Sequence, residues 1–331
     1  MFIQHMYDLI TIGDIKLDTF VVLPKRSAQV KLMKDTRREW LCTEYRAKIS
    51  VTDFAPQIAG SAPNVAVGGA RLALKTAIIS SVGTDSIGTL AVEHLSRERV
   101  DTRHLTKMKD VRSSYSIVTM YREDRTILAA LQPHTFRMPK TCATKWLFVS
   151  EMGPGFEPLF KDIVTRCKNK QIRLGFNPGA LQLKAGLAAL KPILKATSIL
   201  FVNTDEAAQL LNHRNRQSDI THLLTALWKL GPSTVVVTDG PRGAYAFDGG
   251  KPLFMPAFPG KATERTGAGD AFACGFLAAT IHGKSAAEAL RWASANSASV
   301  VRHVGPQPGL LAHTAMRETL RKHHRIQAKE L

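Results

Sequence analysis

Residues Thr266–Ala279 read TGAGDAFACGFLAA, a loop of small residues that ends in Asp270 and continues into an apolar stretch. The apolar stretch predicts a buried helix, which puts the loop at a helix N-terminus. Free N–H groups and the helix dipole favour an anion there, and Gly267, Ala268 and Gly269 are small enough to let a phosphate approach. Asp270 could then accept the proton of an attacking hydroxyl while these N–H groups hold the transferring phosphoryl group. A plain helix cap fits the same pattern, and the loop alone leaves both interpretations open.

Outside this loop, short apolar runs alternate with stretches of helical length such as 63–74, 156–170 and 218–230. The apolar runs are Leu9–Ile12, Ala77–Ser80, Leu147–Val149, Arg173–Phe176, Ile199–Val202 and Thr234–Val237. Alternating β and α elements of this kind predict an α/β fold with a doubly wound, mostly parallel sheet flanked by helices.

Two segments interrupt the alternation, residues 15–58 and 113–131. Each contains strand-like runs separated by polar residues, which predicts a small β-sheet that covers a site as a lid. We expect one domain over residues 1–316 with these lid segments inserted. Residues 317–331 are rich in Lys and Arg and predict a basic C-terminal helix or tail.

The chain has 331 residues, with 45 Lys and Arg against 27 Asp and Glu, and its net charge is +18. Such a charge fits a solvated basic surface, attraction of nucleotide phosphates, or nucleic-acid binding. The basic residues are dispersed, and no nucleic-acid-binding motif accompanies them. Nucleic acid is therefore not an expected partner, and the role of the basic 25–48 segment stays open.

The four cysteines are scattered without a CxxC pair, at Cys42, Cys142, Cys167 and Cys274. This spacing argues against structural zinc and a disulfide framework, and it favours a reducing cytoplasm. No apolar run is long enough to span a membrane, and the first residues lack the features of a signal peptide. We expect a cytoplasmic protein without a membrane partner.

Two motifs suggest a site for a polyhydroxyl compound. Asp14 and Asp18 follow the first strand-like run, and each carboxylate can accept hydrogen bonds from hydroxyl groups. The second motif, AGSAPNVA at residues 59–66, contains Gly60 and Asn64 and opens a helix rich in small residues. Taken singly, these motifs also describe surface turns and a helix start.

Two more motifs follow strand-like runs further along the chain. Asn203 and Glu206 come directly after one run and also fit a capped helix start. The other motif, TDGPRG, contains Thr238, Gly240 and Gly243 and also fits a hairpin turn.

These motifs occur in the order found in the ribokinase-like family, also called the phosphofructokinase-B family of carbohydrate kinases, which the chain resembles from about residue 8 to 311. The resemblance implies that Asp270 is the catalytic base and that the N–H groups of 267–269 form an anion hole. It also implies that Asp14, Asp18, Gly60 and Asn64 position the acceptor. Ala59 departs from the pattern, because the family has a glycine there.

The resemblance further implies ATP and Mg²⁺ as cofactors, with the metal ion held near Asn203 and Glu206 through water. Thr238, Gly240 and Gly243 would contact the nucleotide. A looser match puts Asn296 on the adenine side of the site.

The residues before the loop depart from the family, which usually has Asp-Thr where this chain has Glu264-Arg265. In many members that Asp helps to form a site for a monovalent cation. A longer Glu and a neighbouring Arg could alter or replace the ion, so K⁺ activation is not expected to carry over. Arg265 could itself supply positive charge near the phosphates.

We therefore expect an ATP-dependent phosphotransferase that moves the γ-phosphate to a hydroxyl of a sugar or sugar-like substrate. A nucleoside kinase on the same scaffold is the closest alternative, and a non-catalytic regulatory homologue is a further one. A homodimer formed through the β-lid is compatible with the resemblance. The sequence does not identify the acceptor.

Overall fold

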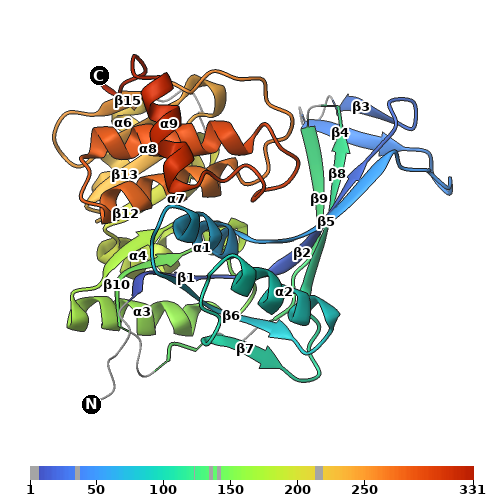
Figure 1. Cartoon of the computed structure of the whole chain (residues 1–331), viewed down its shortest axis with the longest axis horizontal. Coiled ribbons are helices and arrows are strands. Elements are labelled where there is room, and N and C mark those ends of the chain that lie inside the picture. Colours follow the sequence, from blue (N-terminus) through green and yellow to red (C-terminus); the bar gives the residue numbers. More distant parts are fainter. Residues whose placement is uncertain (1–6, 34–37, 123, 134–136, 140–142, 213–218) are drawn as a thin grey trace.

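The structure of the protein is a computed structural model that describes residues 7–33, 38–122, 124–133, 137–139, 143–212 and 219–331 (Figure 1). Within these residues a ten-stranded sheet has the order β16-β15-β14-β13-β12-β11-β10-β1-β6-β7. Its strands are β1 (Tyr7–Ile12), β6 (Thr76–Gly83), β7 (Leu105–Met108), β10 (Thr144–Val149), β11 (Arg173–Phe176), β12 (Ile199–Asn203), β13 (Thr234–Thr238), β14 (Ala244–Phe247), β15 (Leu253–Met255) and β16 (Lys329–Glu330).

From β7 through β13 every neighbouring pair is parallel, whereas β14, β15 and β16 add on as antiparallel strands. Every residue of β6 is buried, because helices cover both faces of the sheet. The predicted doubly wound, mostly parallel sheet is confirmed.

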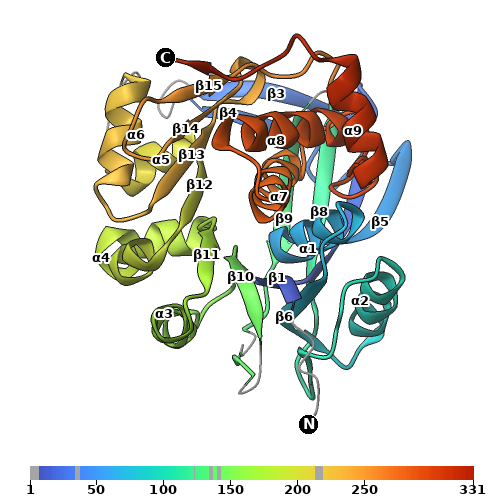
Figure 2. The ribbon, with the colours of Figure 1, turned by 60° about the vertical axis from the view of Figure 1, so that its left-hand side comes forward.

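Helices flank the sheet on both sides (Figure 2). They are α1 (Ser61–Arg71), α2 (Ser86–Arg97), α3 (Glu157–Lys170), α4 (Ala180–Ala196), α5 (Thr204–Leu210), α6 (Ile220–Trp228), α7 (Ala268–Ile281), α8 (Ala286–Val300) and α9 (His313–Lys322). One hydrophobic core packs the helices α3, α4, α5 and α6 against one face of the main sheet. A second core packs α1, α7, α8 and α9 against the other face.

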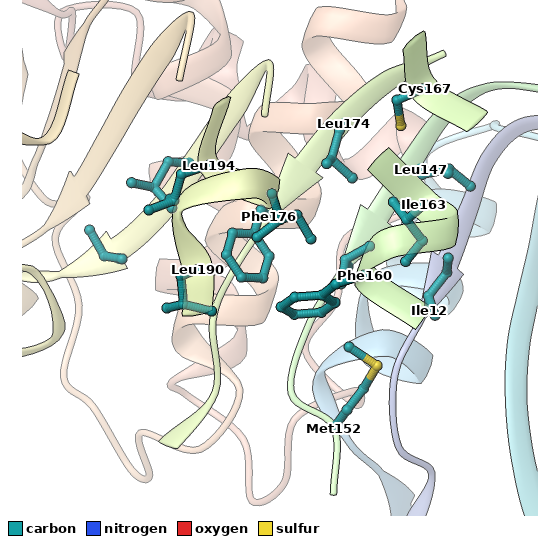
Figure 3. Close-up of a cluster of buried hydrophobic side chains, with 14 of the residues drawn as sticks. Ile12, Leu147, Met152, Phe160, Ile163, Cys167, Leu174, Phe176, Leu190 and Leu194 are labelled. Carbon is teal, nitrogen blue, oxygen red and sulfur yellow. The ribbon is translucent and has the colours of Figure 1, made fainter. Parts of the chain in front are cut away.

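The first core shows how the layers pack (Figure 3). Phe160 of α3 meets Phe176 of β11 edge to face, with ring centroids 5.6 Å apart. On the opposite face, Ala271–Ala279 of α7 are all buried. A helix with no polar stripe must lie between other layers, and α7 lies between the sheet and α8.

A second, four-stranded sheet forms the lid, with the order β5-β2-β8-β9. Its strands are β2 (Lys16–Val22), β5 (Asp53–Ala59), β8 (Ser114–Tyr121) and β9 (Asp124–Ala130), and a hairpin of β3 (Ala28–Met33) and β4 (Arg38–Thr43) extends from it. Figure 1 shows this sheet standing off to one side of the helices. The separate small sheet predicted from residues 15–58 and 113–131 is thus present, and Phe54 and Leu128 are exposed apolar side chains on it.

The basic C-terminal segment differs from the expected helix or tail over 317–331. Helix α9 begins earlier, at His313, and β16 then pairs with β15 at the edge of the main sheet. Arg291, a buried residue of α8, fixes the connection by donating hydrogen bonds to the backbone oxygens of Leu320 and Ile326. These bonds and the strand pairing hold the segment against the domain.

Cys42, Cys167 and Cys274 are free thiols, and Cys142 lies outside the described residues. Among the described helices, none is long and apolar enough to cross a membrane.

Candidate active site

The predicted site residues gather at the carboxyl ends of the parallel strands. Asp14 follows β1, Asn203 ends β12 and Thr238 ends β13, while α7 begins beside them with Asp270 in its first turn. Ligands of open α/β sheets bind at this edge. A cavity of about 240 Å³ lies there. Its lining residues are Ser61, Arg125, Asn177, Phe201, Val202, Asn203, Glu206, Thr238, Arg265, Gly267, Gly269, Asp270 and Phe272.

A second cavity of about 300 Å³ lies at the opposite edge of the sheet, where Arg173, Ile199 and Thr234 begin their strands. Its lining contains none of the predicted site residues and no carboxylate. The smaller cavity is therefore the candidate active site, because it alone of these two gathers a base, a small-residue loop and further polar groups.

The loop before α7 has a backbone that requires glycine at one position. Gly267, the N-cap residue, has φ 77° and ψ 1°, in the left-handed region. A Cβ at this position would collide with Pro306, whereas a Cβ at Gly269 would meet no atom within 4 Å. Gly269 therefore leaves open space in the cavity beside the helix N-terminus, where an anion is favoured.

Asp270 is held by residues of α1. The Asn64 amide donates a hydrogen bond from Nδ2 to Asp270 Oδ2 over 2.7 Å, and its Oδ1 accepts one from Gln307 Nε2 over 2.9 Å. Burial raises the pKa of Asp270, and the nearby Ser61 and Asn64 side chains partly oppose the rise. A raised pKa makes the carboxylate a better proton acceptor, while the hydrogen bonds fix its orientation.

The amide of Asn64 was expected to bind a substrate hydroxyl. In the structure the amide is hydrogen-bonded to Asp270 at one end and to Gln307 at the other, so Asn64 holds the Asp270 carboxyl, and its contact with a substrate hydroxyl stays a prediction. Gly60, just before α1, has φ 120°, and a Cβ there would collide with the backbone oxygen of Asp14. Gly60 thus lets the start of α1 approach the end of β1.

The acceptor side of the site is rich in buried carboxylates. Asp14 and Asp18 are each 3% exposed, and both Asp14 oxygens and Asp18 Oδ1 lack a hydrogen-bond partner in the described part of the chain. Burial, with the nearby Glu151 carboxylate, raises the pKa of Asp14 to about 7. Buried acceptors without donors are costly unless a ligand supplies donors. Hydroxyl groups of a polyol would do so.

Two charged residues that sequence reasoning missed complete this side. Lys16 Nζ lies 3.3 Å from Glu151 Oε2, and both side chains are largely buried. Lys16 also attracts Asp18 and Asp270 electrostatically, and these contacts raise its pKa although burial opposes them. The position of Glu151 shortly after β10, separated from it by Ser150, was the available signal, since other site residues also follow strands.

The stability of the protein should depend on pH through Asp14. Folded Asp14 keeps its proton up to about pH 7, against an ordinary pKa of 3.8, so the folded state binds more protons between these values. We expect the free energy of unfolding to fall as pH rises from about 4 to about 7, by up to about 4 kcal/mol from this group.

Denaturant unfolding at several pH values, compared between the wild type and Asp14→Asn, measures this effect. The variant should lose that part of the pH dependence, because its amide does not titrate. If the free energy of unfolding changed with pH equally in the two proteins, the raised pKa of Asp14 would be contradicted.

On the nucleotide side, Asn203 and Glu206 cap the start of α5 reciprocally. Asn203 Oδ1 accepts from the Glu206 N–H over 2.8 Å, and Glu206 Oε2 accepts from the Asn203 N–H over 2.9 Å. Burial raises the pKa of Glu206, and the nearby charges of Asp270 and Asp205 add to the rise. A cation among these carboxylates would relieve that repulsion.

No cluster of three or more His, Cys, Asp or Glu suited to a metal ion occurs among the described residues. Magnesium commonly keeps several waters and needs only one or two carboxylates together with substrate phosphates. Glu206 and Asn203 at the cavity wall fit that mode of binding.

Three other residues predicted to contact the nucleotide do not line the cavity. Gly240 and Gly243 form a tight turn between β13 and β14, with φ values of 55° and 116°. Asn296 is fully buried; it donates to the Ala271 backbone oxygen and accepts from the Leu311 N–H. The structure gives Asn296 a role in joining α8 to α7.

Glu264 occupies the position before the loop and is 3% exposed. Its Oε1 accepts hydrogen bonds from the N–H and the hydroxyl of Thr266, over 2.6 and 2.5 Å. Among the described residues its ion-pair partner is Arg125 of the lid, whose Nε lies 3.6 Å from Oε1. Arg265, which was expected to supply positive charge near the phosphates, is exposed and lines the cavity.

The known proteins that this chain resembles are carbohydrate and nucleoside kinases. The model of the pfkB family of carbohydrate kinases matches residues 35–313. A 5-dehydro-2-deoxygluconokinase of Halalkalibacterium halodurans is 26% identical over 278 residues, which is 78% of this chain and 84% of that protein.

Solved structures share the fold. A nucleoside kinase of Methanocaldococcus jannaschii, an archaeal member of the ribokinase family, superposes with a TM-score of 0.76 and 21% identity, covering 96% of this chain and 99% of that one. The ribokinase of Arabidopsis thaliana, complexed with ribose and ATP, gives a TM-score of 0.76 and 20% identity with the same coverage.

Proposed function

This chain belongs to the pfkB family of carbohydrate kinases, and on that premise we propose that it transfers the γ-phosphate of ATP to a hydroxyl of a sugar or sugar-like acceptor. The observation that carries the proposal is the hydrogen-bonded Asp270 at the start of α7. Asp270 lines the cavity together with Asn203 and Glu206, and its charge also acts on the buried carboxylate of Asp18.

In the proposed reaction, the acceptor hydroxyl oxygen attacks the γ-phosphorus and its proton passes to Asp270. The bond between this phosphorus and the bridging oxygen breaks, and ADP leaves. The N–H groups of residues 267–269 would bind the phosphoryl oxygens as negative charge shifts among them. Phosphoryl transfer depends mainly on positioning and electrostatics, so these few groups are sufficient.

Mg²⁺ would neutralise phosphate charge when the nucleotide is bound. Glu206 and Asn203 are the residues that would hold it, through water. Their reciprocal hydrogen bonds fix both side chains at the end of β12. Thr238 lines the same wall and would contact the nucleotide.

Asp14 and Asp18 would bind acceptor hydroxyls, since their unpartnered oxygens need donors. The names of the relatives denote different acceptors, including a deoxygluconate derivative, ribose and nucleosides. A nucleoside kinase is the second candidate, because the structural relatives include nucleoside kinases as well as ribokinases.

A screen of ATP consumption over pentoses, hexoses, sugar acids and nucleosides tests the proposal. Phosphorylation of at least one hydroxyl-bearing compound above the background hydrolysis of ATP is the expected result. ATP binding without consumption by any acceptor would instead identify a non-catalytic regulatory homologue.

Turnover is expected to be independent of K⁺. Glu264 already uses Oε1 to hold Thr266, and Arg125 supplies a fixed positive charge beside it. Turnover measured in Na⁺, K⁺ and tetramethylammonium buffers of equal ionic strength should agree within about twofold. Strong activation by K⁺ alone would mean that Glu264 forms a cation site despite the neighbouring guanidinium.

A further inference from the structure

Arg125 is the one residue of the described lid strands that reaches the candidate cavity. It lies near the start of β9, opposite Met120 of β8. The other lining residues come from the main domain, among them Asp270 and Gly267. A single lid side chain therefore shares the cavity with the base and the small-residue loop.

Among the described residues, Arg125 has a charged neighbour in Glu264 but no hydrogen-bond acceptor. Its Nε lies 3.6 Å from Glu264 Oε1, too far for a hydrogen bond, and Glu264 Oε2 has no partner in the described part of the chain. No hydrogen bond joins the guanidinium to another described residue. Because Glu264 is 3% exposed, its charge needs a nearby cation.

Charge and geometry suit this guanidinium to a phosphate. A guanidinium has five N–H donors in a planar fork that matches phosphate oxygens, and Glu264 can take up only one side of it. The side chain of Arg125 is 28% exposed, so it remains open to a ligand in the cavity. The acceptor side already has its own cation, Lys16, which is neutralised by Glu151.

We propose that Arg125 binds the transferring phosphoryl group from the lid, held in place by Glu264. The inference rests on the proposed kinase function and adds a catalytic residue to it. Contact with the terminal phosphate would join the lid to the loop before α7 when ATP is bound. ADP lacks that phosphate and would gain less from Arg125.

The test compares the affinities of MgATP and MgADP in Arg125→Met, with Arg122→Met as the matched control. Arg122 belongs to the same lid, is exposed and stacks on the ring of Tyr121, with 5.2 Å between Cζ and the ring centroid. Its loss removes an equal charge outside the cavity. Isothermal titration calorimetry without acceptor measures both affinities.

Arg125→Met should reduce the preference for MgATP over MgADP by about 10- to 100-fold, the effect of losing charge-assisted hydrogen bonds. Arg122→Met should leave the preference unchanged, and Arg125→Lys should recover part of it. Glu264→Gln should lower the preference in the same direction, because Arg125 loses its ionic partner.

Several outcomes would overturn the proposal. Equal loss of MgATP and MgADP affinity together with a lower melting temperature would mean that Arg125 is structural. Equal behaviour of Arg125→Met and Arg122→Met would exclude a phosphate contact. Failure of the wild type to bind either nucleotide would instead refute the proposed function, so the two failures are distinguishable.

Discussion

Replacing Asp270 by Asn is expected to lower kcat by about 10²- to 10⁴-fold while MgATP still binds, because the variant loses the base but keeps the loop. An amide cannot accept the proton of the acceptor hydroxyl. The substitution keeps the size of the side chain, and Asn64 can still hydrogen-bond it. Steady-state turnover and nucleotide titration of the same preparations measure the two effects separately.

Asp248→Asn is a suitable control for this experiment. Asp248 hydrogen-bonds the Gly250 N–H in an exposed turn after β14, outside the cavity lining. Its substitution should leave turnover unchanged. Near-normal turnover of Asp270→Asn would refute the role of Asp270 as the base.

Gly267→Ala is expected to reduce both stability and turnover. The left-handed backbone costs a residue with a side chain about 1–2 kcal/mol, and the added methyl group would also collide with Pro306. To relieve this collision, either the loop before α7 or the chain around Pro306 must move. Misplaced N–H groups at the start of α7 would then lower kcat by about 10²- to 10³-fold.

Gly283→Ala separates the two causes. Gly283 has φ 76°, nearly that of Gly267, but an added Cβ would meet no atom within 4 Å. This variant should show only the backbone cost in denaturant unfolding and should retain turnover. Gly267→Ala with the stability and turnover of Gly283→Ala would mean that the contact with Pro306 is unimportant.

The main sheet and the lid could be predicted because their signals are local. Runs such as Ile199–Val202 are apolar throughout, as strands covered on both faces must be, and residues 113–131 show two strand-like runs. The strand β16 has only two residues, which are too few to show the alternation of apolar and polar residues that identifies a strand in a sequence. Their pairing depends on where Arg291 holds the preceding segment, which is a tertiary contact.

The candidate site was predictable where its residues follow strands or open a helix. Asp14, Asn203, Thr238 and Asp270 are of this kind, and the structure brings them to one edge of the sheet. Asn296 belonged to a looser match, and its amide is used inside the core.

Arg125 was missed because a tertiary contact brings it to Glu264. Lys16 stands between Asp14 and Asp18 and Glu151 follows β10, but the pairing of these two residues joins distant parts of the chain. Arg125 lies in a lid strand whose local pattern says nothing about what the lid covers. Arg265 was expected to supply positive charge near the phosphates, and it does line the candidate cavity. The guanidinium that approaches the Glu264 carboxylate, however, is that of Arg125 in the lid.

The hydrogen bond from Asn64 to Asp270 joins residues 206 positions apart in the chain. A ribosome must therefore synthesise most of the protein before the proposed base can meet the Asn64 amide. Gln307, which holds the other end of that amide, is made later still. A nascent chain that stops before α7 can contain β1 to β13 and the lid strands, yet it lacks the proposed base and the complete small-residue loop. The residues proposed for catalysis are thus made only after most of the strands that surround them.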